Sequence, residues 1–302
     1  RDLRMSRGLG DVYKRQVLKV RNVSYQAFVS EYRGHAGKLA AEICAMDDND
    51  ICLVAVGGDG TANEVINGIT DFEKVRFGVI PTGSGNDLAR GLSLSKDPKN
   101  GAIHILNAMK KSREDTWCMD LGEVNFGEKK RLFAISAGIG LDALVCKKAL
   151  KSTIKDILNK IRLGKLTYLV LTVQSLFTMQ TADAEIFFDR EEGLQKKRMI
   201  FTAAMNFKAE GGGVPMAPAA SACDGKLSFC EAAGIPKWRT FLCLPFLVAA
   251  KHTSIHGFSV TDAKDCTIRL SRPMVVHADG EYCGEVTEVH FHCLPGKLRV
   301  LK

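Results

Sequence analysis

The sequence predicts an α/β protein of two domains, with a doubly wound N-terminal domain and a C-terminal domain built mostly of β-strands. Three observations lead to this prediction. The first half of the chain alternates buried strands with helices. In the second half, most recognisable segments carry apolar residues at every second position, as half-buried strands do. The length of 302 residues is near the limit for one hydrophobic core, which favours two domains.

The N-terminal domain is predicted from two units of strand, loop and helix. Residues 51–56 (ICLVAV) are continuously apolar, as in a strand buried on both faces of a parallel sheet. This run enters a glycine-rich turn and then a helical segment, and a shorter copy of the arrangement follows. The expected elements are a helix over 37–46, a strand over 51–56, a helix over 62–69, a strand over 77–80 and a helix that begins near Asn86.

The C-terminal domain is expected to begin near 122–125, because the period-two segments start after about Asp120. We therefore expect domains at 17–123 and 124–302, and the last strand can return to the first domain. Residues 1–16 show no usable periodicity and are expected to be a non-native or truncated start. The expected strands are 131–136, 184–188, 199–205, 226–230, 267–270, 274–278 and 286–292, and the expected helices are 141–163 and 236–250.

Composition limits the possible partners and compartment. The chain has 42 Lys and Arg against 34 Asp and Glu, and its charge of +8 suggests an anionic partner such as nucleotide phosphate, nucleic acid or the inner membrane leaflet. Basic stretches interleaved with aromatic residues are absent, so no nucleic-acid partner is expected. The longest apolar run, 241–250, is far shorter than the roughly 20 residues that span a bilayer. Without an apolar signal sequence or a CxxC pair among ten cysteines, we expect a cytoplasmic protein with reduced cysteines.

The sharpest chemical signal is the loop GGDGT, formed by Gly57, Gly58, Asp59, Gly60 and Thr61. Three glycines in four positions let the backbone approach an anion closely, and the amides of the turn and of the helix N-terminus point toward it. The loop therefore predicts a phosphate site, and a turn selected only for its backbone angles is the alternative. The carboxylate of Asp59 in such a loop suggests that it acts through Mg²⁺ or a water network.

A second loop of the same kind covers residues 81–90 (PTGSGNDLAR). Its glycines leave space for a ligand, and Ser84 between them offers a hydroxyl to a phosphate oxygen. Asn86 and Asp87 can instead cap the helix that follows. Arg90 can bind a phosphate or pair with a nearby acid.

Two weaker signals lie near the C-terminus. Asp279-Gly280-Glu281 follows a predicted strand, and these residues can form either a hairpin turn or part of a catalytic site. His290 and His292 share one face of a strand and could bind a metal, but no third ligand is evident in the sequence. We therefore expect ordinary strand histidines.

A basic amphipathic segment covers residues 141–166. Lys147, Lys151 and Lys155 recur at helical spacing on a face separate from the apolar positions. Such a face can dock on anionic lipid, although a solvated helix face is the simpler interpretation.

Several short motifs in order resemble the diacylglycerol kinase catalytic-domain family, in particular its soluble bacterial lipid kinases, with sphingosine and ceramide kinases as more distant relatives. The resemblance covers most of residues 25–302. Beyond the two loops, it rests on 30–36 (SEYRGHA), 137–142 (AGIGLD), Asn206 with 211–213 (GGG), Pro215 and Pro218, 224–227 (DGKL) and 279–281 (DGE).

The resemblance implies an N-terminal domain similar to those of NAD kinase and phosphofructokinase, a C-terminal β-rich sandwich, and a nucleotide site between them. It implies an ATP- and Mg²⁺-dependent lipid kinase that phosphorylates a hydroxyl of diacylglycerol or a related lipid at the inner face of the membrane. Asp279 looks like the family's general base. The implied ATP contacts are Ser30, Gly57, Gly58, Asp59, Gly60, Thr61, Ala62, Asn63, Glu64, Ser84 and Asn86. The implied metal ligands are main-chain oxygens of Cys223, Lys226 and Ser228, with Asp59 and Asp120 linked through water.

The sequence departs from the family in one place. Family members begin with a strand and an Asn-Pro-x-Ser-Gly loop, and no such loop precedes Ser30. Two alternatives therefore stay open, an NAD-kinase-like enzyme, which shares the GGDGT loop, and a non-catalytic module that binds lipid or nucleotide. The sequence does not fix the oligomeric state, and a homodimer is one option.

Overall fold

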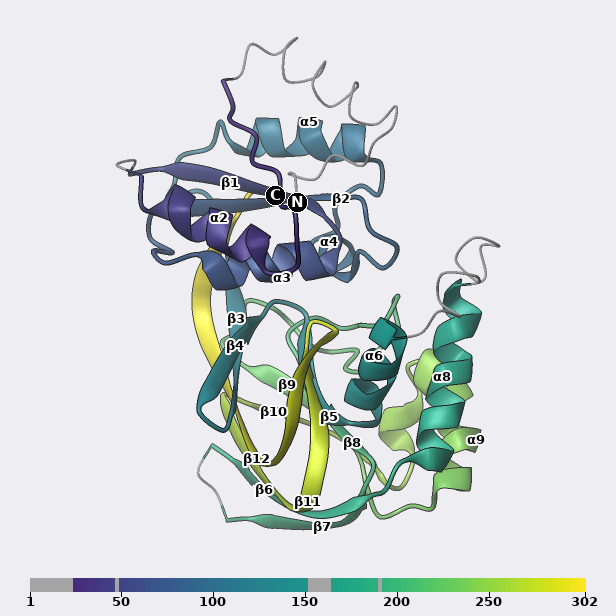
Figure 1. Ribbon diagram of the computed structural model, residues 1–302. Coiled ribbons are helices and arrows are strands. Elements are labelled where there is room, and N and C mark those ends of the chain that lie inside the picture. The colour runs from purple at the N-terminus through teal and green to yellow at the C-terminus, as the bar shows by residue number, and fades with distance from the viewer. Residues whose placement is uncertain (1–23, 47–48, 152–163, 190–191) are drawn as a thin grey trace. The chain divides into compact units, whose positions relative to one another are not determined.

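The computed structural model describes residues 24–46, 49–151, 164–189 and 192–302 (Figure 1). Their contacts divide into two compact units. Unit 1 comprises the chain up to Asp120 together with Gly296–Lys302, and unit 2 comprises Leu121–Pro295. Two strands, β3 (Trp117–Phe126) and β12 (Glu281–Val300), contribute residues to both units.

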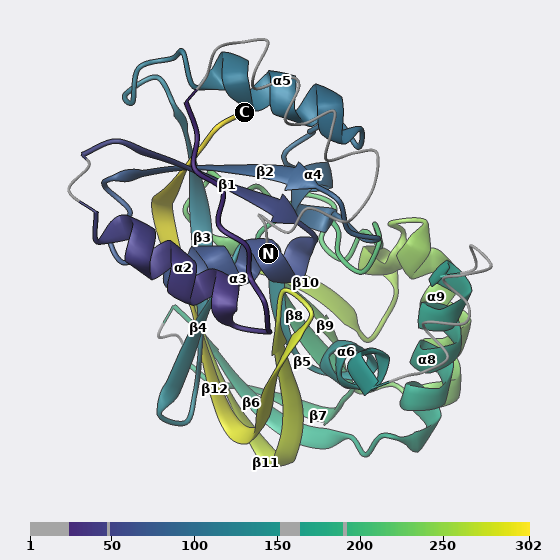
Figure 2. The ribbon, with the colours of Figure 1, turned by 45° about the horizontal axis from the view of Figure 1, so that its top comes forward.

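Unit 1 contains a parallel sheet with helices on both faces, which confirms the doubly wound α/β prediction. β1 (Ile51–Gly57) pairs in parallel with β2 (Val75–Pro81), and the end of β12 pairs in parallel with the other side of β2. The helices are α2 (His35–Cys44), α3 (Asp59–Gly68), α4 (Asp87–Gly91) and α5 (Pro98–Ala108). Figure 2 shows α5 on one side of β1 and β2, and α2 and α3 on the other.

Unit 2 is β-rich, as predicted, and its strands pair mainly antiparallel. β5 (Ser136–Gly140) lies between β11 (Asp265–Ala278) and β8 (Phe201–Met205), and the sheet continues through β9 (Leu227–Ala232) to β10 (Phe258–Ala263). β11 also pairs with β12 and with β6 (Ala182–Phe188), β6 pairs with β7 (Leu194–Met199), and β3 pairs with β4 (Lys129–Phe133). Every residue of β5, β8 and β9 is buried, so these strands form the centre of the core.

The helices of unit 2 lie together on one side of its strands (Figure 1). α8 (Gly164–Thr178) packs against both α6 (Leu141–Lys151) and α9 (Lys237–Val248), and a 3₁₀ turn, η1 (His252–Ser254), follows α9. The buried side of α9 includes Cys243 and Leu247.

Several expected boundaries differ from the structure. The expected strand 131–136 is two strands, because the chain bends between Phe133 and Ser136, where successive backbone amides turn toward a carboxylate. The expected strands 267–270 and 274–278 are one strand, β11, because an irregularity in its pairing accommodates Pro273 at an exposed stretch. Of the expected helix 141–163, residues beyond 151 lie outside the described residues.

Among the helices and strands described, β3, α5, α8, β10 and all of β7 except Met199 were not expected. A start signal for α5 was present in the sequence, since Asp97 and Pro98 are a preferred cap and first residue of a helix. In the structure, the Asp97 carboxylate accepts a hydrogen bond from the Lys99 amide at 3.0 Å. The glycine and asparagine residues inside α5 concealed this signal.

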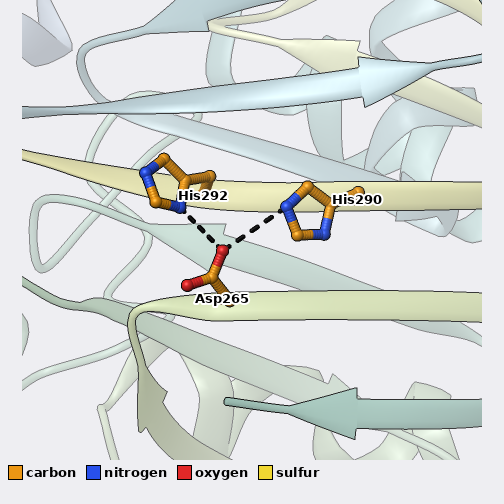
Figure 3. Close-up of side chains that lie close together, drawn as sticks. All are labelled: Asp265, His290 and His292. Atoms are coloured by element: carbon orange, nitrogen blue, oxygen red, sulfur yellow. Dashed lines mark hydrogen bonds and ion pairs between the residues drawn. The ribbon is translucent and has the colours of Figure 1, made fainter. Parts of the chain in front are cut away.

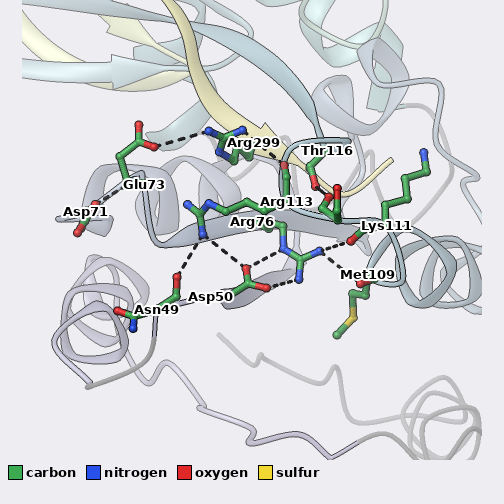
Figure 4. Close-up of polar contacts among 11 residues, drawn as sticks. Asn49, Asp50, Asp71, Glu73, Arg76, Met109, Lys111, Arg113, Thr116 and Arg299 are labelled. Atoms are coloured by element: carbon green, nitrogen blue, oxygen red, sulfur yellow. Dashed lines mark hydrogen bonds and ion pairs between the residues drawn. The ribbon is translucent and has the colours of Figure 1, made fainter.

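A buried arginine anchors β2 in unit 1 (Figure 4). The side chain of Arg76 is 7% exposed and forms a two-pronged pair with Asp50, with distances of 2.8 Å from Nε to Oδ1 and 2.5 Å from Nη2 to Oδ2. Arg76 also donates to the carbonyl oxygens of Met109 and Lys111 beyond α5. The hydrogen bond and charge of Arg76 hold the pKa of Asp50 below its usual value despite partial burial.

We expect Arg76→Met to lower the free energy of unfolding by about 1–3 kcal/mol, because it leaves the two carbonyls and Asp50 without their donor. Denaturant unfolding measures this loss. Lys197→Met, which breaks an ion pair whose side chains are 74% and 47% exposed, should cost much less than Arg76→Met. Because the pKa of Asp50 is lower in the folded protein than in the unfolded chain, the pair of Asp50 with Arg76 stabilises the folded protein fully only at pH values above the unfolded-state pKa. The difference between wild type and Arg76→Met should therefore shrink as the pH falls through the folded-state pKa of Asp50, and a pH-independent difference would contradict this assignment.

Candidate functional site

The two glycine-rich loops lie at the same edge of the parallel sheet in unit 1. Gly57 ends β1 and Pro81 ends β2, and the register of the two strands places these residues opposite each other. The Thr82 amide donates to the Gly57 carbonyl oxygen at 2.9 Å, so the strand pairing continues into the loops. In open parallel sheets this edge, beyond the carboxyl ends of the strands, is where ligands bind.

The loops approach each other at backbone distance. A Cβ atom on Gly83 would lie 2.6 Å from the Gly58 Cα atom, closer than real side chains allow. A Cβ atom on Gly58 would lie 3.3 Å from the Gly83 Cα atom. Glycine is therefore required at position 83 for the observed contact between the loops.

Asp59 joins the two loops through hydrogen bonds. Its carboxylate accepts from the amide of Asp87 at 3.1 Å and from that of Leu88 at 3.0 Å, so it caps the N-terminus of α4. Burial raises the pKa of Asp59, while the bond from the Leu88 amide and the charge of Arg90 oppose that rise. Asp59 thus positions the second loop, and this role does not depend on a bound metal.

Helix capping by the side chains of Asn86 and Asp87 was the alternative to nucleotide binding, and the Asn86 side chain makes no capping hydrogen bond to α4. Asn86 occupies the N-cap position in a left-handed conformation with φ of 53°, but its side chain bonds to the amide and carbonyl of Gly83 and closes the loop. Asp87 pairs with Arg90, which also donates to the Gly85 carbonyl oxygen. Asp59 caps α4 instead, because it follows the end of the neighbouring strand β1 and its carboxylate reaches the first amides of α4.

The remaining predicted nucleotide residues of unit 1 surround these loops. Thr61 lies in the first turn of α3 against Gly57, and Ala62 and Asn63 are buried in the helix. Glu64 accepts a hydrogen bond from the Gly34 amide at 2.8 Å and so ties α3 to the turn that follows the buried Ser30. Ser84 is exposed at the tip of the second loop. Unit 1 therefore brings the two loops and the segment near Ser30 into one region.

Asp279 lies in unit 2, in the turn between β11 and β12. Its backbone has a φ of 47°, and the turn is completed by Gly280 with a φ of 79°. The Asp279 carboxylate accepts hydrogen bonds from the amides of Ala134, Ile135 and Ser136 at 2.8, 2.8 and 3.1 Å. The turn interpretation of this motif is therefore correct, and the turn also holds the carboxylate in a fixed orientation.

A buried cluster near Asp279 was not predicted. His277 Nε2 lies 3.1 Å from the Asp142 carboxylate, and its Nδ1 atom accepts from the Gly280 amide at 3.2 Å. Glu210 accepts from the Ser136 hydroxyl and lies close to both of these side chains. Burial raises the pKa of Glu210, and the pKa of His277 is also raised because the hydrogen bond and charge of Asp142 outweigh burial. In the sequence, the placement of His277 at an alternate position of a predicted strand was a signal that it shares a face with buried residues, but nothing there paired it with Asp142 or Glu210.

The predicted metal ligands are divided between the units. Cys223 and Lys226 are exposed in a turn at Gly225, and the Lys226 amide donates to Asp224 at 3.1 Å. The Ser228 hydroxyl donates to Asp262 at 2.6 Å in unit 2. In unit 1, Asp120 accepts from the Gly296 amide at 2.6 Å. The metal assignment stays a prediction.

Of the three lysines predicted to contact lipid, only Lys147 has a described side chain. Lys147 pairs with Glu285 at 2.5 Å and lies over the Tyr282 ring at 4.9 Å. The hydrogen bond to Glu285 raises the pKa of Lys147. The Lys151 side chain and Lys155 lie outside the described residues. Among the described residues, no helix is long and apolar enough to cross a membrane, and no disulfide joins any of the ten cysteines.

The fold and the paired loops define an α/β protein in which two glycine-rich loops meet at the carboxyl edge of a parallel sheet. Residues 11–119 match the family described as the diacylglycerol kinase catalytic domain, and residues 136–302 match the YegS C-terminal NAD kinase beta sandwich-like domain. The chain therefore belongs to the diacylglycerol kinase catalytic-domain family, as the sequence motifs predicted.

Named relatives agree with this placement. YtlR of Bacillus subtilis, which is assigned as a lipid kinase, is 30% identical over 285 residues, with 93% of this chain and 90% of that protein covered. A diacylglycerol kinase of the same organism is 28% identical, with 81% and 75% covered.

Solved structures share the fold. A protein of Bacillus anthracis assigned as a diacylglycerol kinase has a TM-score of 0.69 at 22% identity, with 90% of this chain and 84% of that chain covered. An NAD kinase of Archaeoglobus fulgidus, solved with ATP, has a TM-score of 0.54 at 13% identity, with 98% and 90% covered. The second likeness confirms the predicted NAD-kinase-like architecture.

Proposed function

We propose that this protein is an ATP- and Mg²⁺-dependent lipid kinase that transfers the γ-phosphoryl group to a hydroxyl of diacylglycerol or a related neutral lipid. The observation that carries the proposal is the contact of two glycine-rich loops at the carboxyl edge of the unit 1 sheet. Glycines at this edge let backbone amides approach phosphate oxygens without interference from side chains. The lipid class follows from the relatives, which are named as lipid or diacylglycerol kinases.

In this proposal, ATP binds to unit 1. The segment 58–64 and the hydroxyl of Ser84 would contact it, and Ser30 and Asn86 would complete the site. The Ala62 amide already donates to the Gly58 carbonyl oxygen at 3.1 Å, so the amides before it would be the ones that face the phosphates. The close approach of Gly58 to Gly83 supports this assignment, since it brings the backbones of the two loops together at the carboxyl edge of the sheet. The oxygen donors assigned to the metal are of the kind that Mg²⁺ prefers. They are the carbonyls of Cys223, Lys226 and Ser228, with Asp59 and Asp120 linked through water. When bound, Mg²⁺ would neutralise charge on the phosphates.

Asp279 would act as the general base. As the lipid hydroxyl oxygen attacks the γ-phosphorus atom and the bond to the ADP oxygen breaks, the Asp279 carboxylate would take the hydroxyl proton. Backbone amides hold the carboxylate without contributing a competing charge. A base fixed in this way needs no reorientation when substrate arrives, which is what phosphoryl transfer requires.

Access to a lipid is supported by the exposed side of α9. Trp238, Phe241, Leu242 and Phe246 recur at helical spacing, and all four are exposed, Trp238 at 61% and Leu242 at 57%. Phe177 of α8, also exposed, packs beside Phe241 with ring centroids 6.0 Å apart. A contiguous exposed apolar face of this kind marks an interaction site. We propose that it contacts the lipid surface, in a cytoplasmic protein that is peripheral to the inner face of the membrane.

Replacing Trp238 and Leu242 together by Ser should weaken binding to phospholipid vesicles about tenfold or more, because burial of each side chain contributes on the order of 1.5–3 kcal/mol. Vesicle co-sedimentation measures the change. Leu194→Ser, on β7 and 48% exposed, removes an exposed apolar residue elsewhere and should leave binding unchanged. If Lys147→Glu weakens binding while the Trp238 and Leu242 variant does not, the contact lies at the basic face of α6 instead.

Incubation with labelled ATP, Mg²⁺, a panel of lipids and NAD tests the proposed activity. Transfer to a lipid hydroxyl is the expected result, and the accepted lipid defines the substrate. Transfer to NAD would instead establish the NAD-kinase-like alternative, which the shared architecture favours as the second candidate. Nucleotide binding without transfer to any acceptor would contradict the kinase proposal and indicate a binding module. Sedimentation of the same preparation reports the oligomeric state, where a homodimer is one option.

A further inference from the structure

Two histidines and an aspartate converge on the outer face of unit 2, where the sequence offered only two possible ligands (Figure 3). Asp265 begins β11, and His290 and His292 lie on β12. The strand register pairs Asp265 with His292 and Thr267 with His290, so all four side chains share one face. The Asp265 carboxylate oxygen Oδ1 lies 2.7 Å from His292 Nδ1 and 3.4 Å from His290 Nε2. The antiparallel partner strand thus supplies the missing third group.

The strands that carry the cluster are held by buried side chains and by backbone hydrogen bonds. The alternate residues Cys266, Phe291 and Cys293 point to the other face and are fully buried in the core. The Asp265 amide donates to the Asp189 carboxylate at 2.8 Å, and the Asp189 amide donates back to the Asp265 carbonyl oxygen at 3.0 Å. These contacts fix the strand start from which the Asp265 side chain projects.

The histidine rings are also oriented. The Thr267 hydroxyl lies 3.0 Å from His290 Nδ1, which leaves Nε2 as the nitrogen turned toward Asp265. The two imidazole rings are stacked, with centroids 6.4 Å apart and planes 18° apart. A hydrogen bond from the second nitrogen of an imidazole is the usual way in which proteins orient a metal-binding histidine.

We propose that Asp265, His290 and His292 bind a divalent transition-metal ion such as Zn²⁺. Two imidazoles and one carboxylate form a donor set that suits Zn²⁺, Ni²⁺ or Cu²⁺ rather than Mg²⁺ or Ca²⁺. Neighbouring ligands of a tetrahedral ion with bonds of about 2.0–2.1 Å lie roughly 3.3 Å apart. The distance of 3.4 Å between Asp265 and His290 matches this value, the 2.7 Å between Asp265 and His292 is shorter, and one ligand atom from each of the three residues lies within 4.8 Å of the others. Only small side-chain rotations are then needed to admit the ion.

The surroundings leave the remaining coordination position open. A hollow of about 330 Å³ is lined by Phe187, Asp265, Thr267, Arg269 and His290, and it has room for a water ligand. The nearby positive charge of Arg269 is paired with Glu288 at 3.0 Å, and its guanidinium also lies over the Phe187 ring. Asp265 lies at the opposite end of β11 from Asp279, so this site is distinct from the proposed kinase residues.

The test uses the full chain after removal of metals with a chelator. Calorimetric titration with ZnCl₂ alone should show one site that His290→Ala weakens about tenfold or more and that His290→Ala with His292→Ala eliminates. Thr267→Val, which removes only the hydrogen bond that orients His290, should weaken binding about tenfold. His256→Ala, an exposed histidine of the same unit, serves as the matched control and should bind like wild type.

Cysteine thiols are the competing ligands for zinc, and none of the ten cysteines is in a disulfide, so the bound ion must be examined directly. X-ray absorption of the one-to-one zinc complex should show nitrogen and oxygen neighbours, and a coordination shell of sulfur would overturn the proposal. Unchanged affinity in the double histidine variant would overturn it as well and would leave an ordinary hydrogen-bonded cluster. Thermal unfolding without metal shows whether the double variant folds as stably as wild type. If it does, zinc should then raise the melting temperature of wild type but not that of the double variant.

Discussion

Asp279→Asn is expected to reduce phosphoryl transfer to lipid by a factor of about 10²–10⁴, the usual contribution of a general base. Nucleotide binding should change little, because the proposed phosphate contacts all lie in unit 1 and Asp279 lies in unit 2. Rapid mixing with labelled ATP measures transfer, and titration with ADP measures binding.

A structural effect of the same substitution must be separated from the catalytic one. The Asp279 carboxylate accepts bonds from three backbone amides, and an Asn side chain presents an amino group to at least one of them. Such a mismatch costs on the order of 1–3 kcal/mol of unfolding free energy. Thermal unfolding of the variant is therefore measured beside its activity.

Asp189 offers a matched control in the same unit. It also has a φ of 47°, and its carboxylate accepts bonds from the amides of Lys264 and Asp265. Asp189→Asn should therefore cause a comparable loss of stability with transfer retained. Equal loss of transfer in both variants would identify Asp279 as a structural residue only, and the base would then be sought in the cluster of Asp142, Glu210 and His277.

The sequence was most informative where the signal is local. The apolar run before Gly57 and the glycines after it predict a strand, a tight turn and a helix within a few residues of one another, and all three are present. The cap of α4 could not be predicted in this way, because Asp59 lies 28 residues before Asp87, and only the parallel pairing of β1 and β2 brings the two together. Local rules assigned the cap to Asn86, whose side chain instead closes its own loop.

The same distinction explains the two clusters of unit 2. Asp142 and His277 are 135 residues apart and meet through the antiparallel pairing of β5 with β11. Asp265 meets His290 and His292 through the pairing of β11 with β12. A periodic strand pattern tells which face a residue occupies, but the partner strand and its register are properties of the whole fold. Clusters built across strands are therefore largely hidden from a single sequence.

Gly83→Val is expected to weaken ATP binding by about 100-fold and to lower the free energy of unfolding by about 1–3 kcal/mol, the cost of overpacking a close contact. A Cβ atom at this position meets the backbone of Gly58 at 2.6 Å, and backbone cannot rotate away as a flexible side chain can. Relief of the clash requires the two loops to separate. That separation would break the bond from the Thr82 amide to Gly57 and displace the amides proposed to bind phosphate.

Gly101→Ala is the matched control in the same unit. Gly101 lies inside α5, and a Cβ atom there would meet no atom nearer than 3.8 Å. The substitution should stabilise the protein by about 0.5–1 kcal/mol, because alanine favours a helix interior more than glycine does. Calorimetric titration with ATP and denaturant unfolding of both variants separate the two cases. If Gly83→Val binds ATP as tightly as Gly101→Ala, the contact between the loops is not part of the nucleotide site, since the clash at Gly58 must move the loops in any folded form of the variant.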